Sequence, residues 1–395
     1  MGKPKLIFIV SRFPYPLEKG DKLRAYYQLK ELSEHFQITL IAVSQKDLND
    51  QQLRIVKKYC ESVHIIRINR LTILFNLFLA LIQGKPLQIG YFFSWKGQRK
   101  VKKILEDLKP DHIFCQLIRC AEYVKDYHSC PKTIDYMDAL SKGIERRIDQ
   151  QNFLMRWLFK LEFKRLLIYE RTIFDYFENK TIISEQDRDY IFHPEKDKIK
   201  VIPNGIDPSF FENLNLQKKY DLIFVGNLSY APNIEAVQFI MNDILKTNPN
   251  WTCLISGANP SKSLIEKCSI NKNVTIHGWV DDIRTSYQKG KIFIAPMMIG
   301  TGMQNKLLEA MASGLPCVTT TMTNNAIKAQ DKKEILVADK PDEFIQIIDK
   351  FLKENDNLNQ VGLAGKNYVQ NNYSWNQVTI PLIQLIEGNQ TIPSN

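Results

Sequence analysis

The sequence lacks the patterns that mark several common classes of protein. Its 395 residues contain seven cysteines and no C-x-x-C pair, so we expect buried, reduced thiols in a cytosolic protein rather than disulfides or a zinc site. The longest apolar stretch, residues 71–82, has twelve positions interrupted by Thr72 and Asn76, whereas a membrane span needs about 20. The apolar run at residues 6–10 is too short for a signal peptide. We therefore expect neither a secretion signal nor a transmembrane helix.

Two further absences narrow the chemistry. No G-x-G-x-x-G follows the first expected strand, which argues against a nicotinamide dehydrogenase. No D-x-D or histidine pattern offers a convincing metal site, so we expect no metal and no cofactor.

The first half of the chain has too few acidic residues to balance its basic ones. Residues 1–200 hold 36 Lys and Arg against 25 Asp and Glu, a balance of +11, whereas residues 201–395 hold 17 against 18. A one-sided field of this kind favours an acidic partner, such as a phosphate or an anionic lipid headgroup. Nucleic acid is not expected, because the charge is scattered and no binding module is visible.

Short apolar runs alternate with amphipathic segments through the whole chain, which predicts parallel sheets covered by helices on both faces. The pattern repeats after a polar, turn-rich segment at residues 204–220, which we interpret as an inter-domain linker. We predict an α/β protein of two doubly wound, Rossmann-like domains, residues 1–203 and 204–373, that face a central cleft. We expect the helix at about residues 374–388 to pack back on the first domain.

The segment at residues 300–320, which follows an expected strand and opens a helix, has the composition of an anion site at a helix N-terminus. Glycines allow close approach of a ligand, the amides of Met303 and Gln304 would point at a phosphate, and Lys306 adds positive charge. Glu309 follows one turn after Asn305, so its carboxylate could bind a ribose diol. A capping box from Thr301 to Gln304 and a surface pair of Lys306 with Glu309 are the structural alternatives.

This loop also resembles the donor-site motif of the family-4 retaining glycosyltransferases, which have the GT-B fold. The match is closest over residues 309–318, EAMASGLPCV, and the form G-x-Q-N-K-x-L-E-A-M-A is similar to a branch associated with bacterial exopolysaccharide synthesis. The resemblance implies that Glu309 binds the nucleotide ribose and that Gly302, Met303 and Gln304 approach the donor. Relatives carry a further glutamate where this chain has Thr301.

Three other segments match the family in the expected order. Residues 221–240 resemble the strand and loop that meet the donor diphosphate at Gly226 and Asn227, although relatives carry a basic pair that is absent here. Residues 274–283 resemble the loop that contacts the base, around Gly278 and Val280. Residues 202–211 resemble the inter-domain hinge. We expect His277, alone at a strand end, to be structural.

In the first domain the resemblance is weaker. Gly20 matches the second glycine of the family's first loop, and Arg24, one turn into the next helix, either reaches a phosphate or lies on a solvated helix face. Relatives often place acceptor-site or transition-state-stabilising groups at later strand ends. The corresponding candidates here are Arg119, Asp138 and Lys142, each with a structural role as the alternative.

The resemblance implies a retaining, metal-independent transfer of a sugar from a nucleoside-diphosphate donor to a glycan or lipid-linked acceptor, with Lys306, Arg119 and Asp138 as catalytic candidates. A weakened sugar-nucleotide-binding subunit and a GT-B-like epimerase are the alternatives. The apolar run at residues 71–82 and the mixed apolar and basic segment at residues 152–169 suggest that the first half rests on the anionic inner face of the plasma membrane. The alternative is that these helices pack on their own sheet.

Overall fold

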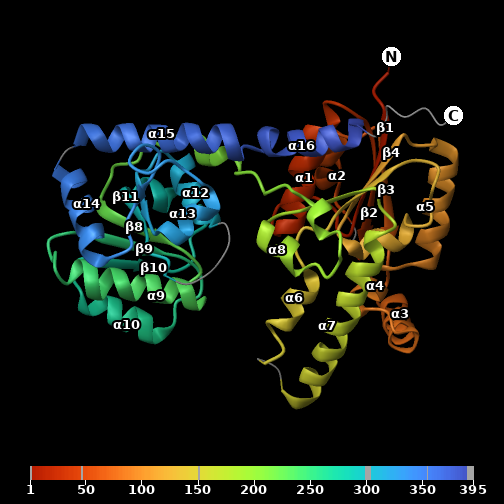
Figure 1. Cartoon of the computed structure of the whole chain (residues 1–395), viewed down its shortest axis with the longest axis horizontal. Helices are drawn as coiled ribbons and strands as arrows, with labels where there is room; N and C mark the ends of the chain where they lie inside the picture. Colours follow the sequence, from red (N-terminus) through yellow and green to blue (C-terminus); the bar gives the residue numbers. More distant parts are fainter. Residues whose placement is uncertain (1, 46–47, 150–151, 299–303, 354, 389–395) are drawn as a thin grey trace. The chain divides into compact units, whose positions relative to one another are not determined.

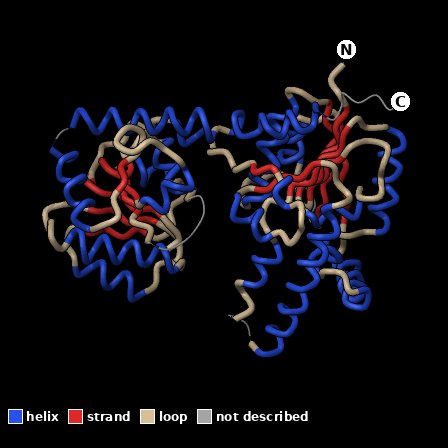
Figure 2. The backbone as a smooth tube through the Cα atoms, in the orientation of Figure 1, coloured by secondary structure: helices blue, strands red, loops and turns tan. Residues whose placement is uncertain are grey.

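The computed structural model describes residues 2–45, 48–149, 152–298, 304–353 and 355–388. The chain divides into an N-terminal unit, Met1–Asn204 with Val378–Asn395, and a C-terminal unit, Gly205–Gln377. In each unit the strands gather in the centre and helices lie outside them (Figures 1 and 2). The predicted class of two Rossmann-like α/β domains is confirmed, and the fold is GT-B.

The N-terminal unit contains a parallel sheet of seven described strands in the order β3-β2-β1-β4-β5-β6-β7. Successive residues of β1 point to opposite faces, since Ile7 and Ile9 belong to one buried cluster while Leu6, Phe8 and Val10 belong to another. Both faces are therefore covered, which explains why the strands read as continuous apolar runs. The strands are β1 (Lys5–Val10), β2 (Gln37–Ser44), β3 (Ser62–Arg67), β4 (His112–Gln116), β5 (Lys132–Asp135), β6 (Asn179–Ile182) and β7 (Lys200–Val201).

The helices of this unit connect the strands. They are α1 (Gly20–Ser33), α2 (Asp50–Lys57), α3 (Arg70–Gln83), α4 (Leu87–Phe92), α5 (Trp95–Leu108), η1 (Ile118–Tyr123), α6 (Leu140–Glu145), α7 (Phe153–Phe174), α8 (Glu185–Tyr190) and η2 (Lys196–Lys198). The last helix of the chain, α16 (Trp375–Gly388), contributes Leu382, Ile383 and Ile386 to the cluster that holds Leu6 and Phe8. Helix α16 thus packs on the sheet that contains β1.

The C-terminal unit repeats the architecture. Its six described strands are parallel, in the order β10-β9-β8-β11-β12-β13. The strands are β8 (Tyr220–Val225), β9 (Cys253–Ser256), β10 (Val274–His277), β11 (Gly290–Ala295), β12 (Cys317–Thr319) and β13 (Leu336–Val337). The helices are η3 (Pro208–Phe211), α9 (Ala231–Phe239), η4 (Ile240–Leu245), α10 (Lys262–Ile270), α11 (Arg284–Gln288), α12 (Asn305–Ala312), α13 (Thr321–Ile327), α14 (Pro341–Lys353) and α15 (Asn355–Tyr373).

All seven cysteines are free, and five of them are buried. No helix within the described ranges is long and apolar enough to cross a membrane.

Candidate active site

The predicted ribose-binding carboxylate is held by a buried tyrosine. The Tyr287 hydroxyl, on α11, donates a 2.8 Å hydrogen bond to Oε2 of Glu309 on α12. Tyr287 is fully buried, and its ring lies against Phe210 and Phe293. Burial raises the pKa of Glu309, the hydrogen bond from Tyr287 opposes that rise, and the nearby charge of Asp207 adds to it. One carboxylate oxygen is therefore fixed, and Oε1 accepts no hydrogen bond from the described residues.

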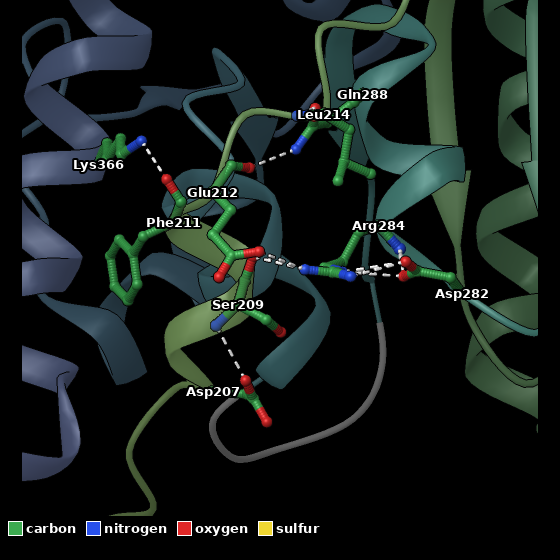
Figure 3. A network of polar contacts seen from close by, with 9 residues as sticks. All are labelled: Asp207, Ser209, Phe211, Glu212, Leu214, Asp282, Arg284, Gln288 and Lys366. Carbon is green, nitrogen blue, oxygen red and sulfur yellow. Dashed lines mark hydrogen bonds and ion pairs between the residues drawn. The ribbon is translucent and has the colours of Figure 1, made fainter.

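A polar network fixes the helix that carries Tyr287 (Figure 3). The Arg284 guanidinium donates hydrogen bonds to both carboxylate oxygens of Asp282. It also pairs with the Glu212 carboxylate at 3.0 Å and donates to the Ser209 carbonyl. Gln288 donates to the Glu212 carbonyl at 2.7 Å.

The same network holds part of the segment that was predicted to be an inter-domain linker. The linker predicted at residues 204–220 is not a free connection, because residues 209–214 are tied to α11 and the Phe211 carbonyl accepts a 2.6 Å bond from Lys366 of α15. The hydrogen bond from the Ser209 amide to Asp207 at 2.9 Å fixes the carboxylate whose charge acts on Glu309.

We expect Tyr287→Phe to weaken binding of a nucleoside diphosphate about threefold to tenfold, because the loss of one hydrogen bond of about 1 kcal/mol frees Glu309 to turn away from the ribose. Titration calorimetry with a ribonucleotide and its 2′-deoxy form gives the sharper readout. The wild type should prefer the ribonucleotide, and the variant should lose part of that preference. An unchanged preference together with a lowered melting temperature would assign Tyr287 to stability alone.

Lys306 lies one turn before Glu309 on α12, but its ammonium group contacts other residues than Glu309. Its ammonium group binds Oδ1 of Asn233, lies 3.3 Å from Sδ of Met297 and sits 5.0 Å from the centre of the Phe224 ring. No Asp or Glu of the described residues forms an ion pair with it. Burial lowers the pKa of Lys306 to about 8. The predicted surface pair of Lys306 with Glu309 does not form, and the ammonium charge remains available for an anion.

Asn233 links Lys306 to the end of β8. Its side chain donates a 2.9 Å bond to the Asn227 carbonyl while its oxygen receives Lys306. A Cβ at Gly226 would lie 2.8 Å from Asn233, and a Cβ at Gly257 would lie 1.7 Å from the Gly226 carbonyl oxygen. The ends of β8 and β9 thus approach each other so closely that only glycine fits. Ligands of open α/β sheets bind at these carboxyl ends of the strands.

The Lys306 ammonium predicts a pH dependence. Below about pH 8 the group is charged in the free protein, so kcat/KM should fall as pH rises through about 8, and Lys306→Arg should remove the fall from that range. The effect of this group on the free energy of unfolding has the opposite dependence on pH. Between about 8 and the ordinary lysine value the unfolded chain binds more protons, so this group's contribution to the free energy of unfolding rises with pH. A kcat/KM profile that is flat across pH 8 would contradict the assignment.

The other predicted donor-site residues lie at neighbouring places. Asn227 is exposed, and its side chain accepts from the Ser229 amide and hydroxyl, so it shapes the loop after β8. Gly278 and Val280 follow β10, where the Gly257 amide donates to the His277 carbonyl at 3.1 Å. Gln304 precedes the first residue of α12, Asn305. Thr301, Gly302 and Met303 lie outside the described residues.

A second group of candidates lies at the strand ends of the N-terminal unit. Arg119, which follows β4, donates two hydrogen bonds to Oε1 of Gln88, at 2.7 and 3.0 Å. Its guanidinium lies 5.4 Å from the centre of the Phe92 ring, and that of Arg12 lies 5.5 Å from the same ring. Burial and, after it, the charge of Arg12 lower the pKa of Arg119. The two guanidinium groups thus lie near the same aromatic ring, and both residues line a cavity of about 290 Å³.

Asp138 belongs to the same neighbourhood. Its charge and that of Asp21 act on Arg119, and Asp21 itself pairs with Arg12. Leu117 and Met137, which follow β4 and β5, are non-glycine residues in the left-handed region, with φ of 66° and 62°. Such backbone is costly and is often found at functional sites. Gly20 begins α1, where a Cβ would meet no atom within 4 Å.

Two candidates of this unit have structural partners. Arg24 is fully buried and pairs with the fully buried Asp135 at 2.6 Å, and it also binds the Asn204 side chain at 3.0 Å. Neither expectation for Arg24 holds, because it is not on a solvated helix face and its donors are engaged in the core. Lys142 pairs with Glu145 on its own helix, and its ammonium lies 5.0 Å from the centre of the Tyr190 ring.

Among its described residues the C-terminal unit therefore offers a fixed carboxylate, a half-buried ammonium without a carboxylate partner and strand ends lined by glycine. A carboxylate can accept hydrogen bonds from a ribose diol, and an ammonium can bind a phosphate. Nucleotides bind at the carboxyl ends of strands of this kind. The sequence did not reveal Tyr287 or Asn233 as members of the site. Asn233 directly follows Pro232 at the start of α9, but nothing near it in sequence indicates that it meets Lys306.

Comparison with known proteins finds similarity to glycosyltransferases. Residues 219–354 match the family model of glycosyl transferases group 1. An uncharacterized 44.6 kDa protein of the cps region of Klebsiella pneumoniae is 24% identical over 401 residues, which cover 95% of this chain and 97% of that protein. The Escherichia coli UDP-Gal:alpha-D-GlcNAc-diphosphoundecaprenol alpha-1,3-galactosyltransferase is 27% identical over 147 residues, 32% of this chain and 38% of that enzyme.

This chain is a glycosyltransferase. In its fold, the glycosyltransferase is similar to Anabaena Alr3699/HepE, solved in complex with UDP-glucose, with a TM-score of 0.58 and 12% identity over 98% of this chain and all (100%) of that one. The segment that matches the family model contains Gly226, Asn233, Tyr287, Lys306 and Glu309, whereas Arg119 and Asp138 lie outside it. The predicted donor-site residues that the structure describes thus include members of the matched segment, and the predicted acceptor-side residues lie outside it.

Proposed function

We propose that this glycosyltransferase moves a hexose from a nucleoside-diphosphate donor to a glycan or lipid-linked acceptor, with retention of anomeric configuration, in the synthesis of a cell-surface polysaccharide. The observation that carries the proposal is that α12 presents two separate groups, a carboxylate fixed by Tyr287 and an ammonium that no carboxylate of the described residues neutralises. The names of the similar proteins favour a uridine nucleotide and a diphosphoundecaprenol-linked acceptor. No metal and no further cofactor is part of the proposal.

In this mechanism Glu309 binds the ribose hydroxyls and Lys306 faces the diphosphate. The bond between the sugar C1 and the β-phosphate oxygen breaks, and negative charge develops on the leaving diphosphate, where a fixed ammonium in a partly dry site stabilises it. The acceptor oxygen attacks C1 from the same face, and its proton passes to an oxygen of the leaving phosphate. Lys306 needs no proton transfer in this step. Arg119 and Asp138 are proposed to bind or stabilise groups on the acceptor side.

We further propose that the protein works at the cytoplasmic face of the plasma membrane, where a lipid-linked acceptor would be anchored. The positive balance of residues 1–200 suits an anionic membrane surface.

The test is transfer from a panel of nucleoside-diphosphate hexoses to a diphosphoundecaprenol-linked sugar, with the product configuration determined by NMR coupling constants. The proposal expects one donor to give a product of the same anomeric configuration as the donor. An inverted product would refute the mechanism. Binding of a nucleotide without transfer or donor hydrolysis across the panel would favour the sugar-nucleotide-binding subunit instead.

A further inference from the structure

The outer face of α3 is apolar and exposed. Of its fourteen residues, six large apolar side chains are between 39% and 77% exposed: Leu71, Leu74, Phe75, Phe78, Leu81 and Ile82. Their spacing of three and four residues places them on one side of the helix. No other helix in the described part of the chain exposes as many large apolar side chains. An apolar surface of this kind marks a contact with a partner or a membrane.

The inner face of α3 is tightly packed, so the exposed stripe does not come from a loosely attached helix. Ile73, Asn76 and Ala80 are buried, and the Asn76 side chain donates a 2.6 Å bond to the Phe93 carbonyl. A Cβ at Gly90 of α4 would lie only 2.8 Å from Cβ of Ala80. The two helices therefore meet at van der Waals distance along the side opposite the stripe.

Two charged residues of α7 hold the end of α3 and the start of α4. Arg165 donates to the carbonyls of Ala80 and Leu81 at the C-terminus of α3, at 3.3 and 2.8 Å. Glu162, one turn earlier, accepts from the amides of Leu87 and Gln88 at the N-terminus of α4, at 2.7 and 3.1 Å. Each charge faces the helix end that its sign favours. Figure 1 shows α7 running beside this hairpin. The fold thus supports α3 in a fixed place while leaving its outer face bare.

The stretch of sequence that contains α3, α4 and most of α5 carries charge of one sign. Residues 62–105 contain eight Lys and Arg and no Asp or Glu. Five of the eight lie on α5, namely Lys96, Arg99, Lys100, Lys102 and Lys103, and all five are exposed. A second copy of the chain docked on α3 would bring two such basic segments together. An anionic lipid surface is the complementary partner, because it offers hydrocarbon to the stripe and phosphate to the cations.

We propose that α3 is the membrane anchor of this protein and lies in the interface of an anionic bilayer with its apolar face toward the acyl chains. This inference gives a structural basis to the membrane part of the proposed function. At fourteen residues α3 is about 21 Å long, shorter than the hydrocarbon core of about 30 Å, so it lies in the plane of the surface and does not cross it.

The second segment predicted to face the membrane has a different role. In α7, Glu162, Leu166 and Glu170 are buried, so its central part packs on the unit, as the structural alternative expected. Its first turns expose Phe153, Met155 and Trp157, and a single further large apolar side chain, Ile168, is exposed later in the described part of the helix. α7 therefore mainly supports α3, which carries the apolar contact.

Flotation with vesicles tests this assignment. The protein is mixed at low salt with vesicles of phosphatidylcholine containing phosphatidylglycerol and centrifuged through a density gradient. We expect the wild type to float. The double substitution Phe75→Ser with Phe78→Ser should lower the vesicle partition coefficient about 100-fold, because the variant has two fewer aromatic side chains to bury in the bilayer. The matched control, Ile270→Ser with Leu363→Ser, removes two apolar residues of the C-terminal unit that are at least as exposed, and it should float like the wild type.

Three results would overturn the proposal. They are a wild type that does not float, an α3 variant that floats as well as the wild type, and a wild-type dimer in light scattering that the α3 substitutions dissociate. The last result would assign the face to a second copy of the chain. Nucleotide binding by the same variants, followed by thermal shift, separates this inference from the proposed activity, because it reports on the C-terminal unit whether or not the vesicles are bound.

Discussion

Replacing Lys306 by methionine is expected to lower kcat about 100- to 1,000-fold, the range observed when one electrostatic donor is removed from a transition state. Methionine has nearly the length of lysine and fits beside Met297 and Phe224 without a charge. The folded protein should not lose stability, because burial of an ammonium without a carboxylate partner opposes folding. Steady-state kinetics with the preferred donor and a thermal melt measure the two effects separately.

The control for this substitution is Lys291→Met. Lys291 lies on β11 in the same unit but pairs with Asp221 at 2.9 Å, next to the first residues of β8 and β11. Its loss should leave kcat unchanged, since the nucleotide is expected at the opposite end of the strands. A Lys306→Met enzyme with wild-type kcat would show that another group stabilises the leaving diphosphate.

The second large effect concerns stability. Arg24→Met should destabilise the protein by about 3–5 kcal/mol, because it leaves the Asp135 carboxylate buried without its cation. Both side chains are 0% exposed, so water cannot replace the lost contact. The substitution also removes the bond from Arg24 to Asn204, the last residue before the chain enters the C-terminal unit. Urea unfolding measures the loss.

Two further variants separate charge from packing. Arg24→Met combined with Asp135→Asn removes the unpaired charge and should recover part of the stability, which a purely steric effect would not allow. Lys22→Met, which breaks the pair of Lys22 with the more exposed Glu18, should cost less than about 1 kcal/mol. If Arg24→Met cost no more than Lys22→Met, the buried pair would contribute little to stability.

The case of Arg24 shows why the sequence predicted some features and not others. Strands buried on both faces are continuous apolar runs, so the two parallel sheets could be predicted from local pattern alone. Helical spacing, in contrast, does not say which charged residue of α1 turns inward. Arg24 is buried because Asp135, 111 positions later, lies opposite it. A pairing over that distance leaves no trace in a single sequence.

The same limit applies within the active site. Lys306 and Glu309 are three residues apart on one helix, so their proximity could be predicted from the sequence. Tyr287 and Asn233 reach them from α11 and α9, and their roles depend on how those helices pack. The segment at residues 204–220 was interpreted as a linker because it is polar and rich in turns, although its partners Arg284, Gln288 and Lys366 lie far along the chain.

The central claim is that Glu309 binds the ribose of a donor nucleotide in the C-terminal unit. Titration calorimetry of UDP, GDP, CDP, TDP and ADP against the wild type, Glu309→Ala and the control Glu266→Ala, an exposed glutamate of α10, tests it most directly. We predict that one diphosphate binds the wild type and the control equally and binds Glu309→Ala about 10- to 100-fold more weakly, because hydrogen bonds to a charged carboxylate are lost. Equal affinity for all three proteins, or no binding to any, would contradict this assignment of the donor site.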